Sequence, residues 1–255
     1  MTPVRPEFVP DASLSREEME ALQRDIADAA VFADDLPFDP ATITEGPLAT
    51  AGQEPPVVVG VDQAFLDERA VSAVVALRGG EVIERAYAAT PLEIPYIPGL
   101  LSFREGRSIL AAFEELSVTP DLALFDGSGR IHFRQAGLAT HIGVTLDLPS
   151  VGVAKSLLCG TPRGPVDGLP EGTRVAVEAD GNVDAPDGTV VGYAVQSRQY
   201  ESGNASINPL YVSPGHRVSA ETAADFVEGV GGEYKLPEPT RLADKYADEV
   251  KDEVR

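Results

Sequence analysis

The chain has 255 residues, 43% of them hydrophobic, which favours one enzyme-sized core over several small domains. Forty-one acidic residues stand against 20 basic ones, so the formal net charge is −21. This balance excludes a generally basic surface of the kind that usually binds nucleic acid.

The acidity has a second interpretation, because carboxylates keep a protein hydrated in concentrated salt, where charge repulsion is strongly screened. The chain has four lysines and no tryptophan, which fits the same pattern. We therefore expect a halophilic, archaeal source. An ordinary acidic mesophilic protein is the alternative, and equal stability and activity in dilute buffer would favour it.

The compartment is indicated by what the sequence lacks. Cys159 is the single cysteine, so an internal disulfide is impossible and a reducing interior is expected. The first residues do not have the charged-then-apolar order of a signal peptide, and no apolar run approaches membrane-spanning length. We expect a cytoplasmic protein with no membrane partner.

The first predicted element is a helix over 14–31, where Ser15 and Glu18 can form a capping box and Met19 and Ile26 share one face. Residues 34–56 are rich in Pro, Gly, Thr and Asp and predict a loop. We expect this segment, 1–56, to lead into the core.

Short apolar runs and helical spacing predict the core elements. These are strands at 57–61, 70–77 and 81–88, a helix at 103–116, a strand at 122–125, a helix at 135–146 and a strand at 150–153. Gly79 and Gly80 predict a tight hairpin. Further on, we expect strands at 174–178 and 190–197, a helix from Ser219 to about Val230, and a tail helix capped by Thr240.

This order predicts an α/β fold with a ribonuclease H-like mixed central sheet flanked by helices. The catalytic domain is expected at 57–235. Residues 236–255 are expected to form an acidic C-terminal tail helix, in which 244–255 are interpreted as solvated, with a partner-binding segment as the alternative.

Three carboxylates suggest metal chemistry: Asp62 and Asp126 end apolar runs, and Glu105 lies near the start of a helical pattern. An acidic residue at the end of a buried strand is costly unless a cation lies beside it. Mg²⁺ prefers such oxygen ligands, and it can activate water for phosphodiester cleavage. Each residue taken alone could be a helix cap or a surface acid.

Three further features surround these acids in the sequence. Lys155 follows the apolar run 151–154 and is expected to project into the same crevice. His216 is placed on a turn before a helix, as a candidate for water activation or a phosphate contact. The loop 95–101 presents Tyr96 between two prolines, and such a stiff wedge can enter a base stack, although a buried anchor is equally compatible.

Together these segments resemble the endonuclease V family of repair nucleases. The match runs through six blocks: VGVD (59–62), PYIPGLLSFRE (95–105), PDLALFDG (120–127), GLATHIG (137–143), GVAKS (152–156) and NPLYVSPGH (208–216). Several blocks in one order make chance agreement improbable.

The resemblance implies Mg²⁺-dependent hydrolysis, with Mn²⁺ as a substitute, of the second phosphodiester 3′ to a deoxyinosine in single- or double-stranded DNA. It places Asp62, Glu105 and Asp126 around the metal, with His216 assisting and Lys155 on the phosphate. It makes Tyr96 and Pro98 part of the strand-separating wedge. It also implies a pocket for the rotated base, lined by Gly99, Leu101, Gly127, Gly129 and Leu158.

Two departures from the family pattern, Ser128 and the order His132-Phe133-Arg134 in place of His-Pro-Arg, bear on the tuning of the pocket. The alternatives are an inosine-specific ribonuclease, a metal-free lesion-binding protein and a Holliday-junction resolvase of the same fold. The last leaves the proline-flanked tyrosine unexplained. A monomer is expected.

Overall fold

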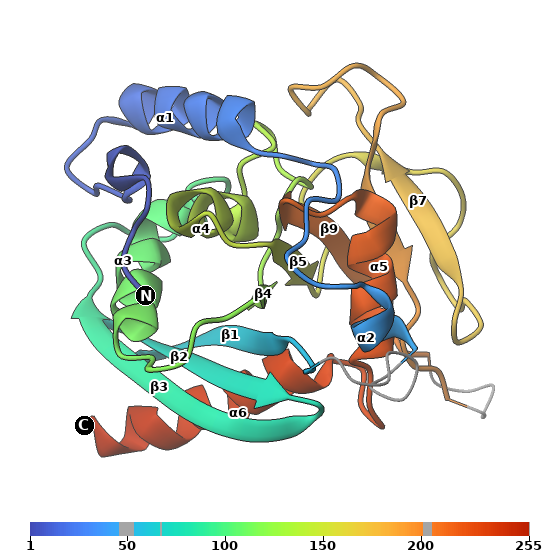
Figure 1. Ribbon diagram of the computed structural model, residues 1–255. Coiled ribbons are helices and arrows are strands. Elements are labelled where there is room, and N and C mark those ends of the chain that lie inside the picture. Colours follow the sequence, from blue (N-terminus) through green and yellow to red (C-terminus); the bar gives the residue numbers. More distant parts are fainter. Residues whose placement is uncertain (46–53, 67, 201–205, 255) are drawn as a thin grey trace.

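The computed structural model describes residues 1–45, 54–66, 68–200 and 206–254. Its elements, labelled as in Figure 1, have these bounds: η1 Pro6–Phe8, α1 Arg16–Ala29, α2 Ala41–Thr44, β1 Val57–Leu66, β2 Arg69–Arg78, β3 Glu81–Pro91, α3 Leu101–Glu114, β4 Leu122–Asp126, α4 Leu138–Leu146, β5 Ser150–Ala154, β6 Thr161–Pro162, β7 Arg174–Glu178, β8 Val190–Val195, β9 Leu210–His216, α5 Ala220–Gly229 and α6 Glu238–Glu253.

The strands form one mixed sheet in the order β3-β2-β1-β4-β5-β9-β8-β7-β6. Within it β1, β4 and β5 are parallel neighbours, and the other pairs are antiparallel. The hairpin joining β2 to β3 turns at Gly79 and Gly80, with φ of 59° and 85°. Two positive φ values match the twist of the flanking strands, so the predicted tight hairpin is confirmed.

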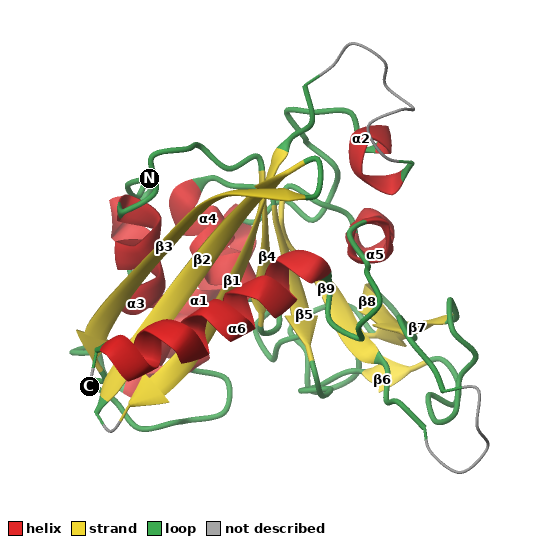
Figure 2. Cartoon of the chain, turned by 90° about the horizontal axis from the view of Figure 1, so that it is seen from below, coloured by secondary structure: helices red, strands yellow, loops and turns green. Residues whose placement is uncertain are grey.

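Helices cover both faces of the sheet, and alternate residues of the central strands supply a core to each face. Val59 and Val61 pack with α3 and α4 on one face, whereas Val58 packs with α5 on the other. Figure 2 shows α6 crossing one face while α1, α3 and α4 lie behind the sheet. The ribonuclease H-like α/β arrangement predicted from the element order is confirmed.

The acidic tail differs from its expectation as a solvated helix. Helix α6 packs on β1 and β2 through a stripe of small and apolar residues, and Ala243, Ala247 and Val250 are buried. Gly60 of β1 lets α6 approach, because a Cβ there would lie 1.9 Å from the Pro239 carbonyl oxygen. Thr240 does not cap this helix, since Pro237 holds the N-cap position.

Several element boundaries also differ from the sequence prediction. Strand β1 continues past Asp62 because β2 pairs with it as far as Leu66. Helix α4 begins at Leu138, since Gln135 has a left-handed φ of 52°. Strand β8 ends at Val195, before the predicted 197. Strand β6 was not expected. The loop predicted at 34–56 contains helix α2, and residues 46–53 of that loop lie outside the described residues.

Strand β9 was not predicted because Pro214 and Gly215 look like a turn. The strand pairs with β5 along its length but with β8 only from Leu210 to Val212. Its register against β5 shifts between Ser150 and Val151, opposite His216 and Pro214. Proline is tolerated where a strand has a free edge or a bulge, since its missing N–H then breaks no ladder hydrogen bond.

Candidate active site

The three parallel strands deliver charged side chains to one end of the sheet. Val61 lies opposite Phe125, so the next residues along, Asp62 and Asp126, are neighbours where β4 ends. Lys155 follows β5 directly at the same end. The crevice at the carboxyl ends of parallel strands is a frequent ligand site in α/β folds.

Asp62 has the environment expected of a cation ligand. Its side chain is buried, Oδ1 accepts the backbone N–H of Gln63 at 2.7 Å, and Oδ2 has no hydrogen-bond partner. Burial raises the pKa of the Asp62 carboxyl, and the nearby charge of Asp126 raises it further. A buried carboxylate with an unpartnered oxygen favours either a proton or a metal ion, so the donor set fits a divalent cation.

Glu105 reaches the site from helix α3. The side chain is buried and accepts a hydrogen bond from Arg104 at 3.1 Å. Burial raises the pKa of Glu105 to about 7, opposed by the charge and hydrogen bond of Arg104 and supported by the charge of Asp126. The negative charge of Asp126 therefore raises the pKa of both buried acids.

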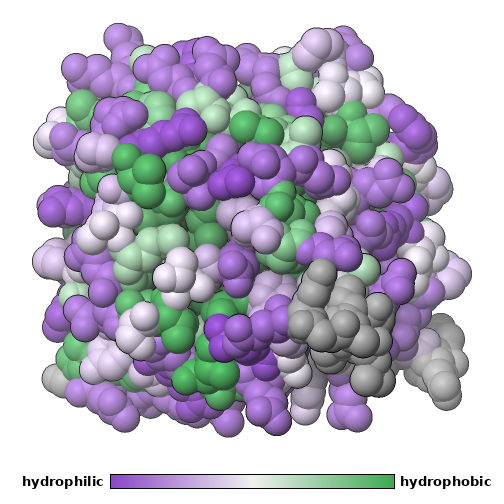
Figure 3. Space-filling view, viewed as in Figure 1, coloured by the Kyte–Doolittle hydropathy of each residue, from purple (hydrophilic) through white to green (hydrophobic). Residues whose placement is uncertain are grey.

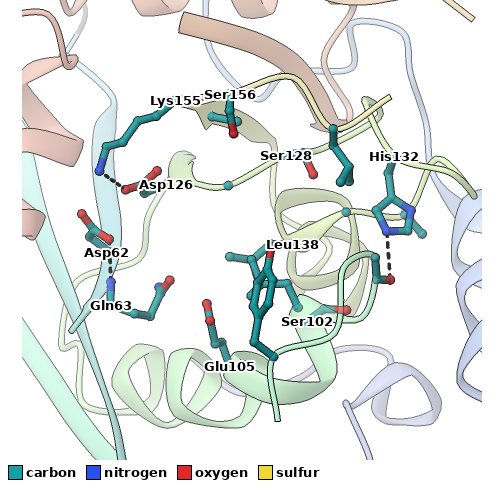
Figure 4. Close-up of a pocket in the computed structure, with 18 of the residues that line it drawn as sticks. Asp62, Gln63, Ser102, Glu105, Asp126, Ser128, His132, Leu138, Lys155 and Ser156 are labelled. Atoms are coloured by element: carbon teal, nitrogen blue, oxygen red, sulfur yellow. Dashed lines mark hydrogen bonds and ion pairs between the residues drawn. The ribbon is translucent and has the colours of Figure 1, made fainter. Parts of the chain in front are cut away.

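Lys155 donates a 2.6 Å hydrogen bond to Asp126 Oδ2, as Figure 4 shows. Burial lowers the pKa of this lysine, but the hydrogen bond and the charges of Asp126, Asp62 and Asp244 more than compensate, so its pKa is raised. The ion pair takes an oxygen that a cation would use. Within the described residues no cluster of three His, Cys, Asp or Glu side chains is already arranged to hold a metal.

Asp244 is a functional candidate that the sequence interpretation missed. It lies on α6, between the residues of that helix that pack on Gly60 and on Ala64 of β1. Its charge raises the pKa of both Asp62 and Lys155, which places it near the acidic cluster. The signal for it was the apolar stripe through Ala243 and Ala247, which predicts a helix packed on the sheet.

A pocket of about 330 Å³ opens beside these charges. It brings together most of the residues that the sequence singled out: Asp62, Tyr96, Gly99, Leu101, Glu105, Asp126, Gly127, Lys155 and Leu158. Figure 4 shows the acids along one side of it, with Ser128 and His132 on the other. Gln63, Ser102, Leu138 and Ser156 also line the pocket and were not predicted.

Residues 95–98 form a strap at the mouth of this pocket. Tyr96 is 63% exposed and Pro98 is exposed, whereas Ile97 packs against the cluster of Met19, Leu100 and Phe103. An exposed ring on a stiff, anchored backbone is compatible with a wedge. Pro98 belongs to this strap and does not line the pocket.

Gly129 does not line the pocket, contrary to expectation. Its N–H donates to Ser213 Oγ at 2.9 Å, and a Cβ on it would lie 2.3 Å from the Pro214 carbonyl oxygen. The absence of a side chain at Gly129 therefore serves its close packing against β9.

His216 is likewise not part of the pocket. It lies opposite Ser150 at the start of β5, whereas Lys155 follows the end of that strand. Its ring is 1% exposed; Nδ1 accepts the Val31 N–H at 3.2 Å and Nε2 lies 3.1 Å from Asp147 Oδ1. Burial lowers its pKa although Asp147 opposes the shift. Strand β9, which was not predicted, places His216 at the other end of the sheet, so the structure does not bring it together with the three acids.

Comparison with known proteins relates this site to one family. The family model for Endonuclease V matches residues 46–245. An Endonuclease V of the halophilic archaeon Haloarcula marismortui is 64% identical, over 98% of this chain and 97% of the relative.

Solved structures show the same relationship. The Streptomyces avermitilis Endonuclease V has a TM-score of 0.76 and 30% identity, covering 100% of this chain and 99% of that one. The fold is also shared by Ciona intestinalis Endonuclease V in complex with DNA containing an inosine followed by a ribo-adenosine, with a TM-score of 0.69, 24% identity, and coverage of 94% and 98%.

Proposed function

The chain belongs to the endonuclease V family of deoxyribonucleases, and from this membership we propose that it is a DNA repair enzyme specific for deoxyinosine. It takes the deaminated base into the pocket beside Gly127 and hydrolyses the second phosphodiester bond on the 3′ side. The single observation that carries the proposal is the convergence of Asp62, Glu105 and Asp126 on one pocket of about 330 Å³.

The acids would hold a divalent cation, Mg²⁺ or Mn²⁺ in its place, through the free Oδ2 of Asp62 and the carboxylates of Asp126 and Glu105. When bound, such a cation supplies charge stabilisation at the phosphate and a water of lowered pKa. Asp244 adds negative charge that favours the cation.

The remaining pocket residues bind and orient the substrate. Lys155 donates Nζ–H to an oxygen of the scissile phosphate, exchanging Asp126 for the substrate. Tyr96 occupies the space left by the rotated base and holds the strands apart, as a stiff ring can. Leu101 and Leu158 give the base apolar contacts.

An inosine-specific ribonuclease is the second candidate. It is favoured by the Ciona relative, whose bound DNA carries a ribo-adenosine after the inosine. A pocket that mainly reads the base would tolerate a neighbouring 2′-hydroxyl. Matched strands with inosine in DNA or in RNA, cleaved side by side, separate the two candidates.

The test of the proposed function is nicking of a labelled deoxyinosine oligonucleotide in high KCl, with the cut position mapped. Cutting should require Mg²⁺ or Mn²⁺ and should leave a matched deoxyadenosine strand intact. Asp62→Asn and Asp126→Asn should each lower the rate by at least about 10³-fold while retaining deoxyinosine binding in Ca²⁺. Asp248→Asn on the distal part of α6 is the matched control, and full activity in either site variant would contradict the assignment.

A further inference from the structure

Helix α1 carries an unexpected polar residue on its buried face. Gln23 is 1% exposed and shares that face with Met19 and Ile26, both buried and apolar. Helix α1 lies outside the region that the family model matches. A buried amide is costly unless both its donor and its acceptor are used, so its partners indicate its role.

Those partners belong to the pocket. Gln23 Nε2 donates to the Gly99 carbonyl oxygen at 2.8 Å, and Oε1 accepts from Arg134 Nε at 2.7 Å. The same carbonyl accepts from His132 Nε2 at 3.0 Å, shown dashed in Figure 4, and from Arg134 Nη2 at 3.4 Å. One backbone oxygen is therefore held by donors from α1 and from the loop between β4 and α4.

Gly99 is the point at which the strap enters the pocket. Its φ is +82°, and a Cβ there would lie 2.9 Å from the Phe133 ring, so its backbone is confined on both counts. Tyr96 lies three residues before it and helix α3, which carries Glu105, begins two residues after it. The position of its carbonyl therefore sets the position of the wedge relative to the acids.

We propose that Gln23 is a positioning residue that fixes Gly99, and with it the strap 95–98, for recognition of the extruded base, which makes helix α1 part of the lesion-reading site. This inference rests on the proposed function for its substrate, although the tether itself is a property of the free protein. Gln23 also lines the pocket, and it acts through its hydrogen bond to the Gly99 carbonyl oxygen.

Two substitutions remove the tether in different ways. Gln23→Met keeps the length of the side chain and loses the hydrogen bonds with Gly99 and Arg134, together with a longer one to the Ala136 carbonyl oxygen at 3.5 Å. Gln23→Glu keeps the acceptor for Arg134 and loses the donor to Gly99. Ile26→Ala is the matched control, because Ile26 lies on the same buried face but packs against Ala136 and Val144, away from the strap.

The first measurement is hydrogen–deuterium exchange of the free protein, in peptides covering 94–101. Exchange there should be faster in both Gln23 variants than in wild type, and unchanged in Ile26→Ala even if that variant melts at a lower temperature. Unchanged exchange in the Gln23 variants would overturn the tether regardless of which substrate the enzyme cuts.

The second measurement is steady-state nicking of a deoxyinosine oligonucleotide at saturating Mg²⁺. Both Gln23 variants should raise KM about tenfold and leave kcat within about twofold, because loosening the strap weakens base binding without altering the acids. An equal rise in KM for Ile26→Ala would show that α1 contributes only general stability and would overturn the proposal. If wild type cuts deoxyinosine and deoxyadenosine strands alike, the proposed function fails, while the exchange result still decides the tether.

Discussion

At the scale of single residues, burial and charge separate the groups that can do chemistry from those that hold the fold. Asp62 and Glu105 are buried acids with raised pKa values, and Lys155 is a half-exposed lysine bound to Asp126. His216 has both ring nitrogens engaged by other parts of the chain. The first three line the pocket, whereas His216 joins the segment after α1, the α4–β5 turn and β9.

Lys155→Met should lower kcat for nicking by at least about 100-fold, because a positive group facing the developing charge of the phosphate is lost. Stability should change little, since a half-exposed ion pair contributes roughly 0–1 kcal/mol. Lys245→Met is the control, as its lysine only approaches Glu249 at 3.6 Å on the exposed side of α6. Nicking assays and thermal melting measure the two effects; a fully active Lys155→Met enzyme would remove the lysine from the mechanism.

His216→Asn should show the opposite pattern. The shorter side chain cannot reach both Val31 and Asp147, so we expect the free energy of unfolding to fall by about 1–3 kcal/mol. The rate of nicking at a permissive temperature should stay near that of wild type. Denaturant unfolding and single-turnover kinetics test this, and a selective loss of rate without a loss of stability would return His216 to the catalytic site.

At the scale of elements, the site depends on strands that end at different points. Strand β4 ends at Asp126 while β1 continues to Leu66, which opens a step in the sheet where the acids meet. Helix α6 closes the other face of this step and brings Asp244 near Asp62. The packing of α6 on β1 is thus a condition for the local charge of the site.

Gly60→Ala should disrupt that packing. The added methyl group would meet the backbone of Pro239 and Thr240, at 1.9 Å from the nearest atom, so the start of α6 must shift. We expect a loss of about 2–3 kcal/mol in the free energy of unfolding. Gly164→Ala is the control, because a Cβ added at Gly164 would meet nothing within 4 Å. Chemical denaturation that gives equal stabilities for both variants would contradict this close contact.

At the scale of the whole molecule, the net charge is −21 and acidic residues dominate. One of the four lysines, Lys155, lines the pocket. Figure 3 shows hydrophilic side chains over most of one face, with apolar ones scattered among them. None of the helices in the described part of the chain is long and apolar enough to cross a bilayer. Because acidic residues outnumber basic ones, repulsion among like charges destabilises the folded state.

Added salt should weaken this repulsion between carboxylates and stabilise the folded state. The midpoint of thermal unfolding should rise steadily from about 0.2 M to about 2 M KCl, because the screening length falls to roughly 3 Å at 1 M. Differential scanning calorimetry at fixed pH measures it. A midpoint independent of KCl would favour the ordinary acidic alternative over salt adaptation.

Stability should also depend on pH through the buried His141. Burial lowers its pKa to about 4, only partly opposed by its hydrogen bond to the Phe8 carbonyl. The neutral form is favoured in the folded state, so its stabilisation is complete above pH ~6.5 and is lost as pH falls toward 4, by roughly 1.4 kcal/mol per pH unit. His141→Gln should flatten this acid limb by about one proton in equilibrium unfolding; an unchanged slope would contradict it.

The sequence by itself determined the local part of this protein. The capping box of Ser15, the Gly79-Gly80 turn and the apolar runs of β4 and β5 depend on neighbouring residues, and the structure confirms them. The family and the acidic trio were also readable, since each lies within a short block with its own pattern. Asp62 and Asp126 follow paired residues of the parallel strands β1 and β4, which explains why these two acids meet.

Only the tertiary structure decided which distant residues belong together. The sequence placed His216 on a turn, as a candidate for water activation, but the pairing of β9 with β5 places it at the opposite end of β5 from Lys155. Asp244 lies in a tail helix that was expected to be solvated, and no role was expected for Gln23, but packing on β1 and on the strap brings both to the site. Such contacts join positions more than 70 residues apart, and their free energy comes from burial and from hydrogen bonds that exist only once the sheet and its helices have assembled.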